Sequence, residues 1–138
     1  MKRTSVIALF TMAVLSMIGV ASAQDRAAQA TVPFSFSVGD RVLPAATYQV
    51  SSPSAGVMKI QSLDGQTSVL TSYSPDLKDQ GTGSKLVFKR YGDQYFLHEV
   101  LCPSASVQAS IPTSPQEKTT RLLQANKKSS GTITVALR

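Results

Sequence analysis

The clearest indication of the fold is the segment KLVFKRYGDQYFLHEVL, residues 85–101. Two runs rich in β-branched and aromatic residues, 85–90 and 94–101, flank the turn residues Gly92 and Asp93. Runs of this composition around a turn are typical of two antiparallel strands joined as a β-hairpin. We therefore expect a hairpin over residues 85–101.

The same composition recurs upstream of this hairpin. Four short segments are rich in β-branched or aromatic residues and bounded by turn residues: 32–38, 47–51, 57–62 and 67–73. In the first of them apolar and polar residues alternate, so its four apolar side chains are expected to share one face of a single strand. Asp64 and Gly65 predict a tight turn between the third and fourth segments.

Downstream of the hairpin the pattern indicates one helix and a last strand. Ser114 is a good N-cap, Pro115 suits the first helical position, and Glu117 completes a capping box, so we expect a helix over about 115–125. Residues 132–137 alternate as a strand that pairs into the sheet. The predicted fold is all-β, a small antiparallel sandwich or barrel with one C-terminal helix.

The N-terminus has the composition of an export signal. Lys2 and Arg3 precede the apolar run 6–20, and Ala21-Ser22-Ala23 has small residues where signal peptidase cleaves. A retained anchor is the weaker alternative, because a membrane-spanning helix needs ~20 apolar residues. We expect a signal peptide at 1–23, a flexible leader at 24–31 and a single β-rich domain at 32–138. The mature protein would then be in the periplasm or outside the cell, with no transmembrane anchor.

Charge is unevenly distributed along the chain. Residues 24–117 carry seven Lys or Arg and eight Asp or Glu, whereas residues 118–138 carry five bases and no acid. The basic C-terminal end is either a solvated surface or a contact for an anionic surface or a cell-envelope protein. We expect the mature protein to be a monomer.

Residues suited to catalysis or metal binding are scarce. His98 is the only histidine and Cys102 the only cysteine, and no Gly-x-Ser-x-Gly or Cys-x-x-Cys motif occurs. On a regular strand the side chain of Glu99 points away from His98 and does not orient it. We interpret His98 as a strand-face side chain and Cys102 as a small buried one, with an intermolecular disulfide as the alternative.

Metal and phosphate sites find equally little support. Asp76 and Asp79 flank a loop with Gly81, but the Asp-x-Asp-x-Asp-Gly spacing of calcium loops is absent. Residues 81–85 are glycine-rich before a lysine, yet they lack the spacing of a phosphate-binding loop. We therefore assign no catalytic, cofactor-binding or metal-ligating residue, and we expect no cofactor.

Three motifs together resemble one group of proteins: VPFxFxVG from Val32, LPAxxYxV from Leu43 and KLVFxRYGxxYFL from Lys85. With residues 114–118 they span most of the mature chain, which is similar to uncharacterised small secreted proteins of acidobacteria. The resemblance implies export, a β-rich fold and a bacterial source, and it implies no activity. The chain departs from the group at Ala46, where glycine is usual.

We therefore expect an exported, non-enzymatic β-domain that acts as a structural or interaction module. The alternative function is a small ligand-binding or carrier barrel in the cell envelope. A deep apolar cavity would favour the carrier, whereas a filled interior with an exposed sheet edge or apolar patch would favour the module.

Overall fold

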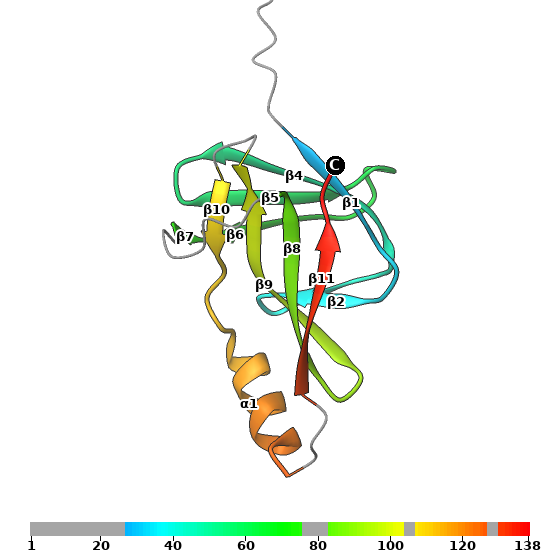
Figure 1. The fold of residues 1–138 in the computed structure, drawn as a ribbon, viewed down its shortest axis with the longest axis vertical. Helices are drawn as coiled ribbons and strands as arrows, with labels where there is room; N and C mark the ends of the chain where they lie inside the picture. Colours follow the sequence, from blue (N-terminus) through cyan, green and yellow to red (C-terminus); the bar gives the residue numbers. More distant parts are fainter. Residues whose placement is uncertain (1–26, 76–82, 104–106, 127–129) are drawn as a thin grey trace, which may run out of the picture.

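A computed structural model describes residues 27–75, 83–103, 107–126 and 130–138. Two sheets curl around one core, in an arrangement between a half-barrel and a sandwich, and one helix lies near the C-terminus (Figure 1). The strands of the two sheets cross at a steep angle in this view. The predicted all-β class with one C-terminal helix is confirmed. The expected signal peptide, 1–23, lies outside the described residues.

The first sheet has four antiparallel strands in the order β1-β4-β5-β6. Its members are β1 (Ala28–Val32), β4 (Ala46–Ser54), β5 (Val57–Ser62) and β6 (Ser68–Ser72). The turn after β5 forms where it was predicted: Gly65 has φ of +73°, and the Asp64 carboxylate accepts hydrogen bonds from the Ser62 hydroxyl and the Gln66 N–H. These two bonds hold the pKa of Asp64 below its usual value.

The second sheet is built on the predicted hairpin of β8 (Lys85–Tyr91) and β9 (Gln94–Cys102). Its main strands follow the order β11-β8-β9-β10-β7, with β11 (Ser130–Ala136), β10 (Val107–Ser110) and β7 (Ser74–Pro75). Beside them, β2 (Phe36–Val38) pairs with β9 in parallel and with β3 (Arg41–Leu43) in antiparallel fashion. The short strands β3, β7 and β10 were not predicted.

Two predictions near the N-terminus are wrong. Residues 28–31, assigned to a flexible leader, belong to β1, which pairs with β4 from Ala28–Val50 to Val32–Ala46. Residues 32–38 do not form one strand, because β1 ends at Val32 and β2 begins at Phe36. Pro33 follows Val32 and has no N–H with which to continue a ladder.

Aromatic side chains fill the centre of the molecule. Phe36, Tyr48 and Phe88 are at most 2% exposed. The Phe36 ring meets the rings of both Tyr48 and Phe88 edge-on, each at a centroid distance of 5.2 Å. The Tyr48 hydroxyl donates to the Pro44 carbonyl at 2.6 Å. This bond joins the proline and the tyrosine of the motif LPAxxYxV, which lie four positions apart.

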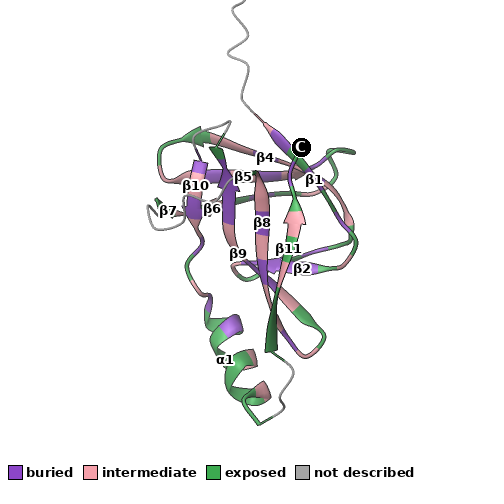
Figure 2. Ribbon diagram, viewed as in Figure 1, coloured by how far each residue is buried: buried purple, intermediate pink, exposed green. Residues whose placement is uncertain are grey.

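Helix α1 (Pro115–Gln124) begins after the predicted N-cap, Ser114. The Ser114 hydroxyl accepts a hydrogen bond from the Glu117 N–H at 3.1 Å. Two further bonds connect the helix to the end of the β8–β9 hairpin: the Tyr91 hydroxyl donates to Glu117 Oε1 at 3.2 Å, and the Thr120 hydroxyl donates to Gln94 Oε1 at 3.0 Å. Most of the helix surface is exposed (Figure 2).

Candidate functional site

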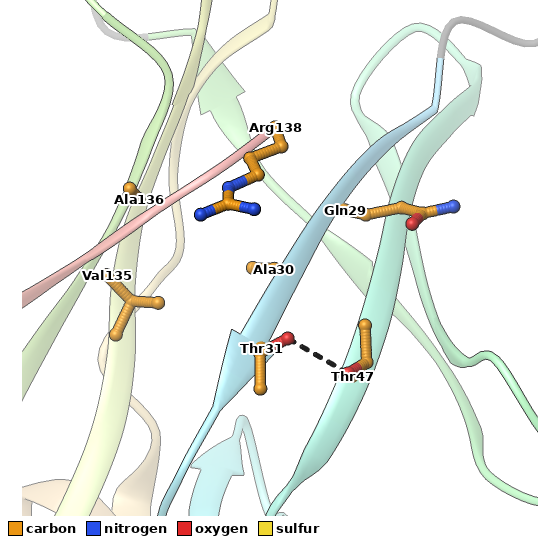
Figure 3. Close-up of a pocket in the computed structure, with 7 residues that line it drawn as sticks. All are labelled: Gln29, Ala30, Thr31, Thr47, Val135, Ala136 and Arg138. Atoms are coloured by element: carbon orange, nitrogen blue, oxygen red, sulfur yellow. Dashed lines mark hydrogen bonds between the residues drawn. The ribbon is translucent and has the colours of Figure 1, made fainter.

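The two sheets meet where β1 of the first approaches the end of β11 of the second. Gln29 and Arg138 exchange two backbone hydrogen bonds there, of 2.9 and 2.8 Å. Beside this pair lies a groove of about 430 Å³, which we call the seam groove (Figure 3). It is lined by Gln29, Ala30, Thr31, Thr47, Val135, Ala136 and Arg138.

Backbone groups from both strand edges point into the seam groove. In an antiparallel ladder the backbone N–H and C=O groups of successive residues point to opposite sides of the strand. Those of Thr31 therefore point to the same side as those of Gln29. On the other edge, the Leu137 N–H donates to the Ser84 carbonyl, which lies on the β8 side. The backbone groups of the neighbouring Ala136 therefore point to the opposite side, toward the seam. A continued ladder would pair Thr31 with Ala136. Among the described residues, however, the Gln29–Arg138 pair is the only backbone pairing between these edges.

The side chains give the groove an apolar floor and a polar rim. Ala30 is 3% exposed and Val135 is half-buried, and both belong to the core or pack against it. The Thr31 and Thr47 hydroxyls hydrogen-bond to each other at 3.0 Å. The side chain of Arg138, an exposed residue, reaches from the end of β11 toward β1 (Figure 3). Free backbone groups beside an apolar floor are what an extended polypeptide needs for strand addition.

His98 lies at a β-bulge rather than on a regular strand. The register of β9 against β8 shifts from Phe88–Leu97 to Val87–Glu99, which leaves His98 as the extra residue. The strict alternation expected around His98 is therefore wrong, and the consecutive residues Phe96 and Leu97 are both buried.

The surroundings of His98 favour its neutral form. Burial, with a further contribution from the charge of Lys89, lowers the pKa of His98, while Glu117 and Glu99 act in the opposite direction. Its Nδ1 atom is buried without a hydrogen-bond partner among the described residues. The hydrogen bonds described here place no serine or cysteine against the imidazole, and we assign His98 no chemical role.

Cys102 is buried at the end of β9, with 3% of its surface exposed, as predicted. The Ser84 hydroxyl lies within hydrogen-bond distance of its sulfur, at 3.8 Å. Such a position shields the thiol from solvent and from thiol reagents.

The basic C-terminal end is divided between folded elements. Lys118 and Arg121 are exposed on α1, and Arg138 ends the chain beside the seam groove. Lys127 and Lys128 lie outside the described residues. The predicted last strand is confirmed, because β11 pairs with β8 from Ser130–Tyr91 to Ala136–Lys85.

Asp76, Asp79 and Gly81, and with them the start of the glycine-rich segment 81–85, lie outside the described residues. Elsewhere in the described chain, no three His, Cys, Asp or Glu side chains gather in a group that would hold a metal ion.

Sequence reasoning missed the seam groove because it assigned residues 24–31 to a leader. The signal was present: Ala28, Ala30 and Val32 alternate with the polar residues Gln29 and Thr31, with the period of a half-buried strand. Alanine has a low strand propensity, which hid this pattern.

None of the helices among the described residues is both long and apolar enough to cross a membrane. No family model matches the chain, and no curated protein or solved structure matches it.

Proposed function

We propose that this protein is an exported, non-enzymatic interaction module that binds an extended polypeptide segment along the seam groove. The observation that carries the proposal is the interrupted ladder between β1 and β11. Gln29 and Arg138 pair, and the next two residues that face the seam, Thr31 and Ala136, line a groove. A partner strand laid there would bond to the backbone groups of both edges.

Backbone pairing alone would bind such a strand weakly. The four groups of Thr31 and Ala136 would form about four hydrogen bonds, each contributing roughly 0.5–1.5 kcal/mol net. Association itself costs at least ~4 kcal/mol. Contacts with the floor of Ala30 and Val135, and a carboxylate beside Arg138, would have to supply the rest. We therefore expect a transient complex, with a Kd of roughly micromolar order.

The packing of the interior supports an interaction module over the alternative carrier barrel. A carrier holds its ligand in a cavity lined mostly by apolar side chains. Here the central positions are occupied by Phe36, Tyr48 and Phe88, and the Phe36 ring contacts the other two. The seam groove lies at the surface, between strand edges, where a polypeptide backbone fits better than a small apolar ligand.

A second groove of similar volume lies between β3 and β6 and is a weaker candidate. It is lined by residues 41–42 and 66–69. Four of these six side chains are polar, and among the described residues no backbone hydrogen bond joins β3 to β6, whereas the Gln29–Arg138 pair begins a ladder at the seam groove. β6 therefore serves as the control edge in the test.

The test is site-specific photo-crosslinking in the native cell envelope. A photoreactive phenylalanine analogue replaces Thr31 in one protein and Leu70, on the outer edge of β6, in the control. We expect polypeptide adducts from position 31 that are absent from position 70.

A second pair of variants tests the backbone pairing itself. Ala136→Pro removes a seam-facing N–H and should abolish the adducts, whereas Ser68→Pro, which removes an outward N–H of β6, should leave them. Thermal melting confirms that both variants fold. Equal labelling from positions 31 and 70, or adducts that survive Ala136→Pro, would refute the proposal.

A further inference from the structure

Helix α1 turns its polar side toward the sheets. Glu117 is 3% exposed, and Thr120 and Gln124 are partly buried. Thr120 and Gln124 follow Glu117 by three and seven positions, so the three side chains form one stripe along the helix. The stripe rests on the end of the β8–β9 hairpin through the bonds from Tyr91 to Glu117 and from Thr120 to Gln94.

The leucines of the helix face solvent as a consequence. Leu122 and Leu123 are 72% and 74% exposed, the highest values among the large apolar side chains described as exposed. A surface helix usually buries its apolar stripe against the core. Helix α1 reverses this rule, and the helix lies at one end of the molecule (Figure 1).

Positive charge accompanies these leucines. Lys118 lies one turn before Leu122 on the same face, and Arg121 precedes it directly; both basic side chains are exposed. The single acid of the helix, Glu117, lies one turn before Arg121, but it is buried and accepts the Tyr91 hydrogen bond. The exposed residues of the described helix therefore carry two cations and no anion.

We propose that the outer face of α1, made of Lys118, Arg121, Leu122 and Leu123, docks on an anionic lipid surface. The leucines enter the boundary between head groups and acyl chains, and the two bases lie against lipid phosphates. This contact is separate from the seam groove and does not depend on it.

The pattern of the helix favours a lipid surface over a protein groove or a second copy. Helices that dock in protein grooves place apolar anchors at i, i+3 or i+4, and i+7, whereas these leucines are adjacent. A second copy would bring like charges together at the contact. A lipid surface requires no register, and its negative potential complements Lys118 and Arg121.

Vesicle sedimentation with the protein recovered after export tests the contact. The probes are vesicles of about equal phosphatidylglycerol and phosphatidylcholine, and vesicles of phosphatidylcholine alone. We expect binding to the anionic vesicles that weakens with added salt. The double variant Leu122→Ser/Leu123→Ser should reduce the partition about tenfold or more. The matched control Leu70→Ser removes an exposed leucine from β6 and should leave the partition unchanged.

A second pair of variants tests the charge. Lys118→Gln/Arg121→Gln should reduce binding roughly 25-fold, about fivefold for each base removed. The control Arg41→Gln/Lys59→Gln removes the same net charge from β3 and β5 and should have a much smaller effect. Circular dichroism confirms that all variants keep the fold.

Three results would overturn the proposal. One is equal binding to both vesicle types, and another is wild-type binding by the serine double variant. The third is a wild-type dimer in sedimentation equilibrium that the serine variant converts to a monomer, because that result would assign the face to a second copy.

Discussion

Replacing Tyr48 by phenylalanine removes one buried hydrogen bond and leaves the aromatic packing in place. The hydroxyl of this fully buried residue donates to the Pro44 carbonyl at 2.6 Å. Its loss leaves that carbonyl without its donor, so we expect Tyr48→Phe to cost about 1–2 kcal/mol of unfolding free energy. A change of 1 kcal/mol shifts Tm by roughly 4–8 °C in a domain near this size, and the variant should melt roughly 4–16 °C lower.

Thermal melting followed by circular dichroism measures the effect, and Tyr95→Phe is the matched control. Tyr95 stacks on Phe34 at a centroid distance of 4.2 Å and is half-buried. Its hydroxyl takes part in none of the hydrogen bonds described here. We expect its removal to change stability by no more than about 0.5 kcal/mol.

The Tyr48→Phe variant also tests how stability depends on alkaline pH. Burial, with a smaller contribution from the charge of Asp64, raises the pKa of Tyr48 above its usual value near 10. Because this pKa is higher in the folded state, the native protein binds the Tyr48 proton more tightly than the unfolded chain does. The stabilisation that follows from the raised pKa is therefore complete below about pH 10 and falls as the pH rises through the folded pKa.

Above pH 10 the wild type should consequently lose stability faster than Tyr48→Phe. Tyr91, whose pKa is also raised, is present in both proteins and cancels in the comparison. A Tyr48→Phe protein that melts like the wild type at pH 7, or one whose alkaline profile is identical, would show that the hydroxyl contributes nothing to the fold.

Two further predictions concern the ends of the chain. Deleting residues 130–138 removes β11 and with it seven paired positions along β8, so the truncated protein should melt far lower or fail to fold; a truncated chain with the wild-type Tm would contradict this pairing. Mass spectrometry of the exported protein should find Gln24 as its first residue, because Ala21 and Ala23 form the cleavage pattern; a membrane fraction that retains Met1 would show that no cleavage occurs.

Strands whose own composition is distinctive were predicted well. β5 has the predicted bounds, 57–62, and the hairpin of β8 and β9 differs from its predicted bounds by one residue at each C-terminal end. The Ser114 N-cap located the start of α1, because its hydroxyl accepts the Glu117 N–H within the first helical turn. Such signals lie within a few residues of one another and are readable in a single sequence.

Elements that depend on distant partners were missed. β10 has four residues, and its strand conformation follows from pairing with β9 on one side and β7 on the other. β1 is built mainly from alanine, glutamine and threonine and exists as a strand beside β4. Neither segment has a strand propensity high enough to be recognised in the sequence. Pairing with neighbouring strands and burial supply most of the free energy that holds each segment in the strand conformation.

The fold class, the main hairpin, the capped helix and the expectation of export follow from the amino-acid sequence, since each depends on local composition or spacing. Which surfaces are available for binding depends on tertiary packing. The seam groove exists because strands more than 100 residues apart in the chain converge at Gln29 and Arg138 and diverge beside them. The leucines of α1 are exposed because the β8–β9 hairpin binds the polar stripe of the helix, an orientation that no helical periodicity specifies.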